Sequence, residues 1–478
     1  MVYATKYGDE HCLPFRSVIG LLTGDSASPC LWNIYFADFQ LREHPDDVRL
    51  HGRALCQAEQ ADDNIIMSTS FPAFQEKVAE FFCWCKNKRV FISARKSKWM
   101  IFGLLPHIIP ILRLGDLCVE LVSQFKYVGI WLTSTTPNIF SLNYSIKASK
   151  ARNASNAIFA MKHRIGSLPP KEGLQLYMAR VDCYLISAAE ISIDVDAHLI
   201  DEYLEVQHLF VRRLLGINSR SMLAVLFTET GLMPIRIRRL LQALARARYM
   251  ATLGDERHVR WAMLDSLDLF TAGHPGWAAD IAILLRSLPT PIRIVPADFL
   301  CAATIDAISK KVVEVVDADL QFDIDNLQKT HLLRNRLESV EDKKLALVTR
   351  RRRHYLTMVP VPAHRKALTR LLLSDHNLSV ERLRYPARHR LPIPRDERLC
   401  RFCRRDVEDE VHALLECDAY SPLVALRDTF LEDAFQCDSA LEAAYQLLPR
   451  YDFLHRVLSS RKAVKRFAKF VHEVLGLF

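Results

Sequence analysis

The chain has 478 residues, of which 50% are hydrophobic and 25% are charged, and its formal net charge is +9. This ordinary globular mix predicts about two to four domains with sizeable cores. No apolar run approaches the ~18–20 residues of a membrane span, and residues 1–15 lack the order of a signal peptide. We therefore expect an intracellular protein, in the nucleus or cytoplasm, with no membrane partner. Twelve cysteines in so long a chain exclude a disulfide framework, and most are expected to be reduced core residues.

Residues 1–135 combine strand-like and helical patterns. Apolar spacing predicts a helix from Ser28 onward, and the run 55–68 predicts two strands joined by a tight turn. The same patterns predict one amphipathic helix and three further strands, at 71–87, 90–92, 99–102 and 125–131. The last strand contains Gly129, which indicates close approach of another backbone or a ligand.

The remainder of the chain is predicted to be mainly helical. Residues 142–253 have helical patterns throughout, including a helix at 196–215 that ends at Gly216 as a C-terminal cap. Glycine and proline at 273–291 predict a boundary, and the acidic run 312–325 predicts an exposed helix or linker. A final amphipathic helix is predicted at 454–475, with its cations away from the apolar face.

Positive charge is concentrated between Lys343 and Arg405. This segment has 18 Lys and Arg against 4 Asp and Glu, a local charge of +14. Clustered guanidinium groups favour phosphate, because they pair bidentately with its oxygens. The alternative is a solvated surface that keeps the chain soluble. We predict contact with RNA and DNA through Arg384, Arg388, Arg390, Arg401, Arg404 and Arg405.

Two adjacent carboxylates, Asp62 and Asp63, lie in the predicted turn at 55–68. Nucleotidyl transfer uses two divalent ions roughly 4 Å apart, and Mg²⁺ prefers oxygen ligands. One Asp-Asp turn cannot hold two ions alone, so a third carboxylate on a neighbouring strand is needed. The other such pair, Asp46-Asp47, leads into no apolar run, and we interpret it as a solvated turn.

In this context the segment 20–131 resembles the latter half of a reverse transcriptase of the non-LTR (long interspersed element) retrotransposon kind. Such an enzyme is an RNA-directed DNA polymerase, a nucleotidyltransferase of transposable elements. Five motifs of the family match in order along the chain: motif B at 20–29, motif C at Ala61-Asp62-Asp63, the pair Trp84-Cys85, motif D at 96–102 and motif E at 125–129.

The resemblance implies roles for individual residues. Asp62 would bind the catalytic Mg²⁺ ions, Asp63 would support them, and Lys96 would donate a proton to the leaving pyrophosphate. The binding site for the template and the incoming nucleotide would be lined by Gly24, Asp25 and Ser28. The primer grip would consist of Phe125, Lys126, Tyr127 and Gly129.

The chain departs from the family pattern in two places. Gln60 replaces the aromatic residue that usually precedes Ala61. Motif A, the source of the third carboxylate, is missing, since the only acidic residues before Gly24 are Asp9 and Glu10. We therefore expect an N-terminally truncated enzyme, inactive as a polymerase by itself. The upstream part of the element's polyprotein would then be a partner.

A second candidate site is the pattern Cys400-x2-Cys403-x8-His412-x4-Cys417. Three thiolates and one imidazole at this spacing are typical of a closed, structural Zn²⁺ site. A redox role for Cys400 and Cys403 is the weaker alternative, because no βαβ pattern surrounds them. A chance arrangement of core or surface residues is the other alternative. The pattern also resembles the Cys-Cys-His-Cys zinc knuckle that follows the reverse transcriptase in many such elements.

The predicted fold class is α+β and mostly helical. It comprises a partial polymerase palm, in which helices pack on a small antiparallel sheet, then a helical thumb and linker and a small zinc-binding module. Three functions compete: a reverse-transcriptase fragment, a non-catalytic nucleic-acid-binding protein, and a helical interaction protein with no nucleic-acid role. The expected domains are the palm at 1–135, the thumb at 140–255, the linker at 256–380, the zinc knuckle at 381–425 and C-terminal helices at 426–478.

Overall fold

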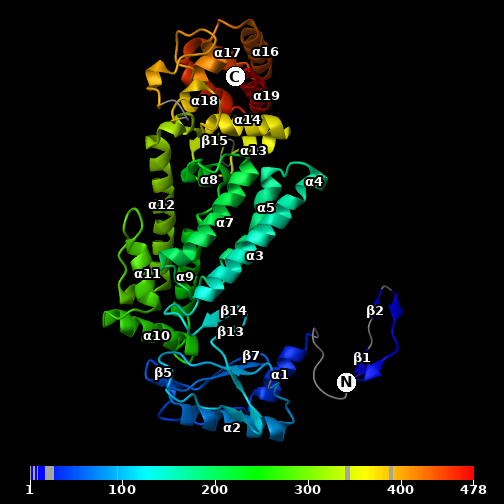
Figure 1. Ribbon diagram of the computed structural model, residues 1–478, viewed down its shortest axis with the longest axis vertical. Helices are drawn as coiled ribbons and strands as arrows, with labels where there is room; N and C mark the ends of the chain where they lie inside the picture. Colours follow the sequence, from blue (N-terminus) through cyan, green and yellow to red (C-terminus); the bar gives the residue numbers. More distant parts are fainter. Residues whose placement is uncertain are drawn as a thin grey trace. The chain divides into compact units, whose positions relative to one another are not determined.

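The computed structural model describes residues 2–3, 6–7, 9–16, 26–93, 95–339, 345–386 and 391–478. The chain forms two compact units, Met1–Leu142 with Leu253–Asp268 and Asn143–Thr252 with Leu269–Phe478 (Figure 1). The described residues are α+β and mostly helical, which confirms the predicted fold class at that level. No described helix combines the length and the apolar character that crossing a bilayer requires.

The strands of the first unit are short, and the described ones pair only two by two. All pairs are antiparallel except that of β9 with β12. A continuous palm sheet is therefore not confirmed. The strands are β1 (Val2–Tyr3), β2 (Lys6–Tyr7), β3 (Glu10–His11), β4 (Phe15–Arg16), β5 (Val48–Leu50), β6 (Arg53–Leu55), β7 (Gln57–Gln60), β8 (Asp63–Ile66), β9 (Lys98–Trp99), β10 (Arg113–Leu114), β11 (Leu117–Cys118), β12 (Glu120–Leu121), β13 (Gln124–Tyr127) and β14 (Ile130–Thr133).

Aromatic side chains form the core of the first unit. Its helices are α1 (Ser28–Phe36), α2 (Phe71–Lys88) and most of α10 (His258–Thr271). Phe36 at the end of α1 packs edge-on against Trp84 of α2, with ring centroids 4.7 Å apart. Trp99 of β9 lies in a second cluster, which Val78 of α2 joins from the same helix. Helix α2 thus connects both clusters and stabilises the unit.

The pair Asp46-Asp47 is not the solvated turn that the sequence predicts. Asp47 is 3% exposed, and its Oδ1 lies 2.8 Å from Nζ of Lys77, which is equally buried on α2. Lys77 also donates a hydrogen bond to the carbonyl of Arg42. The prediction fails because the ion pair forms between residues thirty positions apart, and no local pattern announces it.

The second unit is almost entirely helical. Its only strands among the described residues are β15 (Leu337–Ser339) and β16 (Leu345–Leu347), which form a hairpin. The helices are α3 (Ser141–Ala160), α4 (Lys162–Ile165), α5 (Pro170–Arg180), α6 (Asp182–Leu185), α7 (Ala197–Leu215), α8 (Leu223–Thr230), α9 (Ile235–Ala251), α11 (Trp277–Arg286), η1 (Pro296–Leu300), α12 (Ala302–Asn326), η2 (Gln328–Leu333), α13 (Tyr355–Met358), α14 (Pro362–Leu372), α15 (Ser379–Arg382), η4 (Arg395–Glu397), η5 (His412–Glu416), α16 (Ser421–Cys437), α17 (Ala440–Leu447), α18 (Arg450–Ser459) and α19 (Val464–Leu477).

One large core runs through the second unit from α7 to α19. In its C-terminal part, α19 packs against α14 and α16, and Phe430 stacks on Phe470 at 4.5 Å. Nearer the N-terminal end of the unit, aromatic pairs such as Tyr144 with Tyr203 join α3 to α7. Helix α7 ends at Gly216, whose φ of +70° places it in the left-handed region, so the predicted cap is confirmed.

Two predicted elements of this unit are wrong. The expected boundary at 273–291 contains α11, whose Ala278, Ile281 and Leu285 are fully buried. The expected helix at 454–475 is two helices, because the chain leaves helical geometry at Ser460. The Ser460 hydroxyl donates to Asp438 at 2.7 Å, and a serine that bonds outside its own helix favours a break there.

A buried arginine organises the N-terminal half of the second unit. Arg239 of α9 and Asp194 are each 1% exposed, and Nε of Arg239 donates to both Asp194 oxygens, at 3.0 and 2.8 Å. The same guanidinium donates to the Leu185 carbonyl at 2.7 Å and to the Tyr144 hydroxyl at 3.1 Å. Because nearly every donor has a partner, this charge can be buried without leaving polar groups unsatisfied.

Candidate metal centre

The Asp62-Asp63 turn forms as predicted, at the tip of a two-stranded hairpin. β7 and β8 pair in a register that places Gln60 opposite Asp63, so Ala61 and Asp62 form the turn. Ala61 has a φ of +55°, a backbone conformation that costs an L-residue roughly 1–2 kcal/mol. Both aspartates are exposed.

Two segments distant in the sequence lie near this turn. Nε1 of Trp32, on the helix that contains Ser28, donates to the Ala61 carbonyl at 2.7 Å. Partial burial and the nearby carboxylate of Asp63 raise the pKa of the Tyr127 phenol. Gly24 and Asp25 lie outside the described residues, and Ser28 is the first residue of α1. The fold therefore brings α1 and β13 close to the Asp62-Asp63 turn.

Within the part of the chain that the structure describes, the same turn lacks the other groups that two-metal chemistry needs. Among the described residues, Asp62 and Asp63 belong to no cluster of three potential metal ligands. Lys96 is exposed, and in the described part of the chain it forms no ion pair with either aspartate. Two exposed carboxylates alone give no support for bound Mg²⁺.

The predicted primer-grip strand at 125–131 is instead a hairpin. Phe125, Lys126 and Tyr127 lie in β13, and Val128 and Gly129 form the turn into β14. Both turn residues have positive φ, +45° and +84°. A two-residue turn of this kind requires left-handed conformations, so Gly129 serves the turn, and the sequence-based explanation of close approach is wrong.

The four predicted zinc ligands converge at one point of the second unit. Cys400, Cys403, His412 and Cys417 place their ligand atoms within 4.8 Å of one another, and all but Cys403 are buried. Sγ of Cys400 lies 3.7 Å from Sγ of Cys417, and Sγ of Cys403 lies 3.4 Å from Nε2 of His412. This group could hold a metal ion.

Local backbone bonds hold these ligands in place. The Cys400 amide donates to the Asp406 carbonyl at 2.8 Å, and the Arg404 amide returns a bond to the Cys400 carbonyl, which closes a tight loop around Cys403. His412 begins the short helix η5, and the Cys417 amide donates to the His412 carbonyl. The buried Arg427 of α16 then donates to the Cys417 carbonyl at 2.8 Å.

The separations in the cluster test which chemistry the residues fit. Two sulfurs bound to one tetrahedral Zn²⁺ at about 2.3 Å lie about 3.8 Å apart, close to the Cys400–Cys417 separation. A disulfide needs an S–S distance near ~2.05 Å, so Cys400 and Cys417 at 3.7 Å are two separate thiols. The Nδ1 atom of His412 lies 3.8 Å from a carboxylate oxygen of Glu416, which is too long for the hydrogen bond that usually supports a metal-binding imidazole.

The surroundings shift the pKa values of two thiols of the cluster in opposite directions. Burial raises the pKa of the Cys400 thiol well above its usual value. Burial would also raise the pKa of the Cys403 thiol, but hydrogen bonds from the backbone amides of Asp406 and Arg405 and from the neighbouring thiols together lower it. Cys403 is therefore easier to ionise than Cys400.

Several of the arginines predicted to contact nucleic acid have internal partners. Arg401 pairs with the fully buried Glu408 at 2.8 Å and donates to the Asn377 carbonyl, so it links the loop to its surroundings. Arg384 pairs with Glu381 at 2.6 Å. Arg405 forms an exposed pair with Asp418 at 2.9 Å, while Arg404 is exposed. Arg388 and Arg390 lie outside the described residues.

Glu408 and Arg427 lie beside the cluster, and the sequence pattern assigned neither of them a role. Burial would raise the pKa of Glu408, but hydrogen bonds from the Arg401 side chain and from the Ser379 amide at 2.7 Å lower it. The one visible signal for Glu408 was the acidic run that precedes His412. Its significance depends on partners distant in the sequence.

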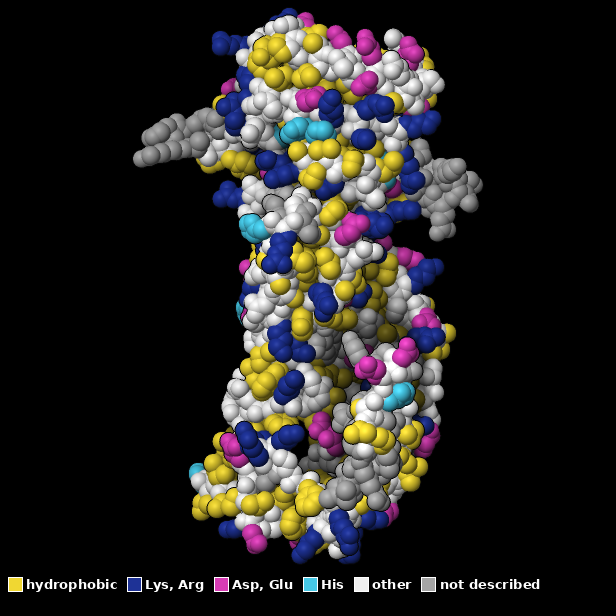
Figure 2. Space-filling view, turned by 90° about the vertical axis from the view of Figure 1, so that its right-hand side faces the viewer, with side chains coloured by type: hydrophobic (Ala, Val, Ile, Leu, Met, Phe, Trp, Pro, Cys, Tyr) yellow, Lys and Arg dark blue, Asp and Glu magenta, His cyan; other side chains and the backbone are white. Residues whose placement is uncertain are grey.

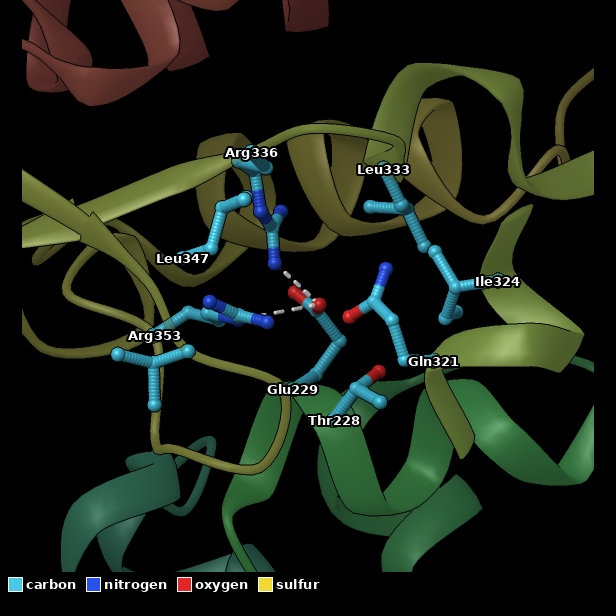
Figure 3. A pocket seen from close by; sticks show the side chains of 9 residues that line it. Thr228, Glu229, Gln321, Ile324, Leu333, Arg336, Leu347 and Arg353 are labelled. Atoms are coloured by element: carbon cyan, nitrogen blue, oxygen red, sulfur yellow. Dashed lines mark hydrogen bonds and ion pairs between the residues drawn. The ribbon is translucent and has the colours of Figure 1, made fainter. Parts of the chain in front are cut away.

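A buried ionic network lies elsewhere in the second unit, beside a small cavity (Figure 3). Arg336 and Arg353 both point toward Glu229 of α8, with Arg353 at 3.6 Å, and Thr228 and Gln321 complete the polar lining. The space open to the centre of a water molecule is about 10 Å³. A cavity of this size holds about one water, so it is no site for a substrate.

Comparison with known proteins adds no assignment: no protein-family model matches the chain, and no curated protein matches it.

Proposed function

We propose that this chain is a zinc-stabilised nucleic-acid-binding protein. The observation that carries the proposal is the convergence of Cys400, Cys403, His412 and Cys417 at separations that suit one tetrahedral ion. A bound Zn²⁺ would cross-link the loop at 400–406 to η5 and would supply no chemistry, since four protein ligands leave no open position. The chain's own Arg427 donates a hydrogen bond to the carbonyl of Cys417 and so helps to orient that ligand.

Charge supports nucleic acid as the partner. The segment 343–405 has a large excess of Lys and Arg, and such clusters bind phosphate with little dependence on base sequence. The internal pairs of Arg384 and Arg401 reduce the number of these cations that are free for phosphate. Binding through the remaining ones would weaken steeply with salt.

The test is the metal content of the full chain together with binding to single-stranded RNA and DNA. We expect one Zn²⁺ per chain, lost in Cys403→Ser and retained in Cys301→Ser, an exposed cysteine outside the cluster. Nucleic-acid affinity should fall as salt rises. A chain without zinc, or one whose binding is independent of salt, would contradict the proposal.

A second candidate is descent from a reverse transcriptase, with the catalytic machinery incomplete. Its support is the contact of Trp32 with the Ala61 carbonyl and the proximity of Tyr127 to Asp63, which bring α1 and β13 to the Asp62-Asp63 turn. Among the described residues no third carboxylate joins this pair, which favours inactivity. Primer extension on an RNA template with Mg²⁺ or Mn²⁺ tests this. Incorporation that is lost in Asp62→Ala would overturn the predicted inactivity.

A further inference from the structure

Helix α19 has an exposed row of cations on the side opposite the core. Arg461 and Lys462 precede the helix, and Lys465, Arg466 and Lys469 follow at intervals of four residues, all exposed. Residues four apart lie on one face of a helix, about 6 Å apart along its axis. The five residues therefore form one surface, which we call the α19 stripe.

The stripe has little internal neutralisation. Lys469 lies 3.7 Å from Glu473, which is the one ion pair that the stripe forms with the described part of the chain. Arg461, Lys462, Lys465 and Arg466 pair with no carboxylate of the described residues. This contrasts with Arg384 and Arg401, whose guanidinium groups are held by glutamates. On the face drawn in Figure 2, Lys and Arg side chains of the upper part lie among hydrophobic and acidic ones.

Helix stability does not explain the arrangement. Four of the five cations precede the helix or lie in its first turn, which contains no acidic residue. The positive end of the helix dipole disfavours cations there by a few tenths of a kcal/mol each. Mutual repulsion between neighbouring cations adds to this cost. An external polyanion would relieve both effects.

The opposite, buried face of α19 distinguishes between two kinds of polyanion, a membrane surface and a nucleic acid. Val464, Phe467, Ala468, Phe470, Val471 and Val474 are all at most 2% exposed, because they pack in the core. A helix that binds a membrane surface uses an apolar face to enter the lipid boundary, and α19 has none available. A phosphate backbone needs only the cations.

We propose that the α19 stripe is the main contact surface for single-stranded nucleic acid, and that Arg384 and Arg401 near the Cys-His cluster have mainly a structural role. This inference rests on the proposed function and gives that function a location. The sequence-based assignment included Arg384 and Arg401 among the residues that contact nucleic acid. The present proposal assigns that contact to Arg461, Lys462, Lys465 and Arg466 instead.

The test compares two variants of the full chain with equal charge loss. In the first, Arg461, Lys462, Lys465 and Arg466 are changed to Gln. In the matched control, four exposed cations of the same unit are changed to Gln, namely Lys171, Arg180, Lys310 and Lys311. Each phosphate contact contributes about 0.7 to the slope of log K against log salt for single strands. We expect the stripe variant to lose about 3 from this slope and about 100-fold in affinity near 0.15 M salt, and the control to lose far less.

Three results would overturn the inference, and they differ in what they imply. If the wild type does not bind RNA or DNA, the proposed function fails as well. If the wild type binds and both variants lose affinity equally, only the α19 assignment fails. If the stripe variant retains nucleic-acid binding but loses binding to phosphatidylserine vesicles, the partner is a membrane surface. Zinc content and the thermal midpoint of each variant show that the fold is intact.

Discussion

Asp62 and Asp63 lie exposed at the tip of a two-stranded hairpin, whereas Cys400, Cys403, His412 and Cys417 converge in a mostly buried cluster. The first pair comes from one turn and has no third carboxylate among the described residues. The second group brings together ligands up to seventeen positions apart and has Arg427 behind one of them. In the first unit a local motif supplies two carboxylates, and no third joins them among the described residues. In the second unit tertiary packing brings four potential ligands together.

The largest effect should come from removing the metal. Chelation of the zinc-loaded chain should unfold the region around residues 400–417 and lower the thermal midpoint, because structural zinc contributes several kcal/mol or more to folding. Asp62→Asn should leave the midpoint unchanged, since an exposed turn carboxylate contributes little. The measurement is calorimetry with and without chelator. Equal midpoints in both states would remove the contrast between the two regions.

The next effect concerns the buried pair of the second unit. Arg239→Met leaves Asp194 buried without its partner, and such losses cost about 3–5 kcal/mol. Arg246→Met, on the same helix, removes a half-exposed contact with Glu190 at 3.7 Å and should cost no more than about 1 kcal/mol. Denaturant unfolding measures both. Similar losses in the two variants would show that the Arg239 network is not a special source of stability.

Acid should weaken the second unit through Glu338. Burial alone would raise the pKa of this carboxyl, but the hydrogen bond from His354 and the charge of Arg336 lower it to about 2, from an ordinary value of 4.5. Its stabilisation is present above about pH 4.5 and is lost as the pH falls toward about 2, because only the unfolded chain binds the proton in that window.

Unfolding curves measured between pH 5 and pH 2 check this expectation. The wild type should lose a few kcal/mol across that range, and Glu338→Gln should have a shallower dependence, with lower stability already at pH 6. The exposed Glu432 of α16 provides the control, since Glu432→Gln should keep the wild-type slope. An unchanged slope in Glu338→Gln would contradict the assignment.

The smallest effect tests backbone strain in the first unit. Val128 is β-branched, 52% exposed and held at a φ of +45°. Val128→Asn creates the Asn-Gly pair that two-residue hairpin turns favour, and it should stabilise the β13–β14 hairpin by about 1 kcal/mol. Val128→Thr keeps the branch and should give no gain. Hydrogen exchange of the hairpin amides measures the difference, and equal protection in both variants would refute the strain.

Much of this architecture was predictable where the signal is local. The helix that ends at Gly216, the helix after Ser70 and the Asp-Asp hairpin follow from short patterns of caps, apolar spacing and turns. The spacing of Cys400, Cys403, His412 and Cys417 likewise predicted that these four residues would come together in a group that could hold a metal ion.

The features that could not be predicted depend on distant partners. Lys77 pairs with Asp47, Arg239 with Asp194, and Ser460 with Asp438, each from a different element. Clustered arginines could not be divided into internal and exposed ones from composition, because only the fold places a glutamate beside Arg401. The exposed row on α19 was visible as charge, but its lack of partners was not.

The most direct test of the account is the salt dependence of single-stranded RNA binding by the zinc-loaded full chain, measured again after chelation. We predict a steep loss of affinity with rising salt for the loaded chain and a large loss of binding once the metal is removed. Binding that is independent of salt, or unchanged by complete removal of zinc, would contradict the claim that this is a zinc-stabilised nucleic-acid-binding protein.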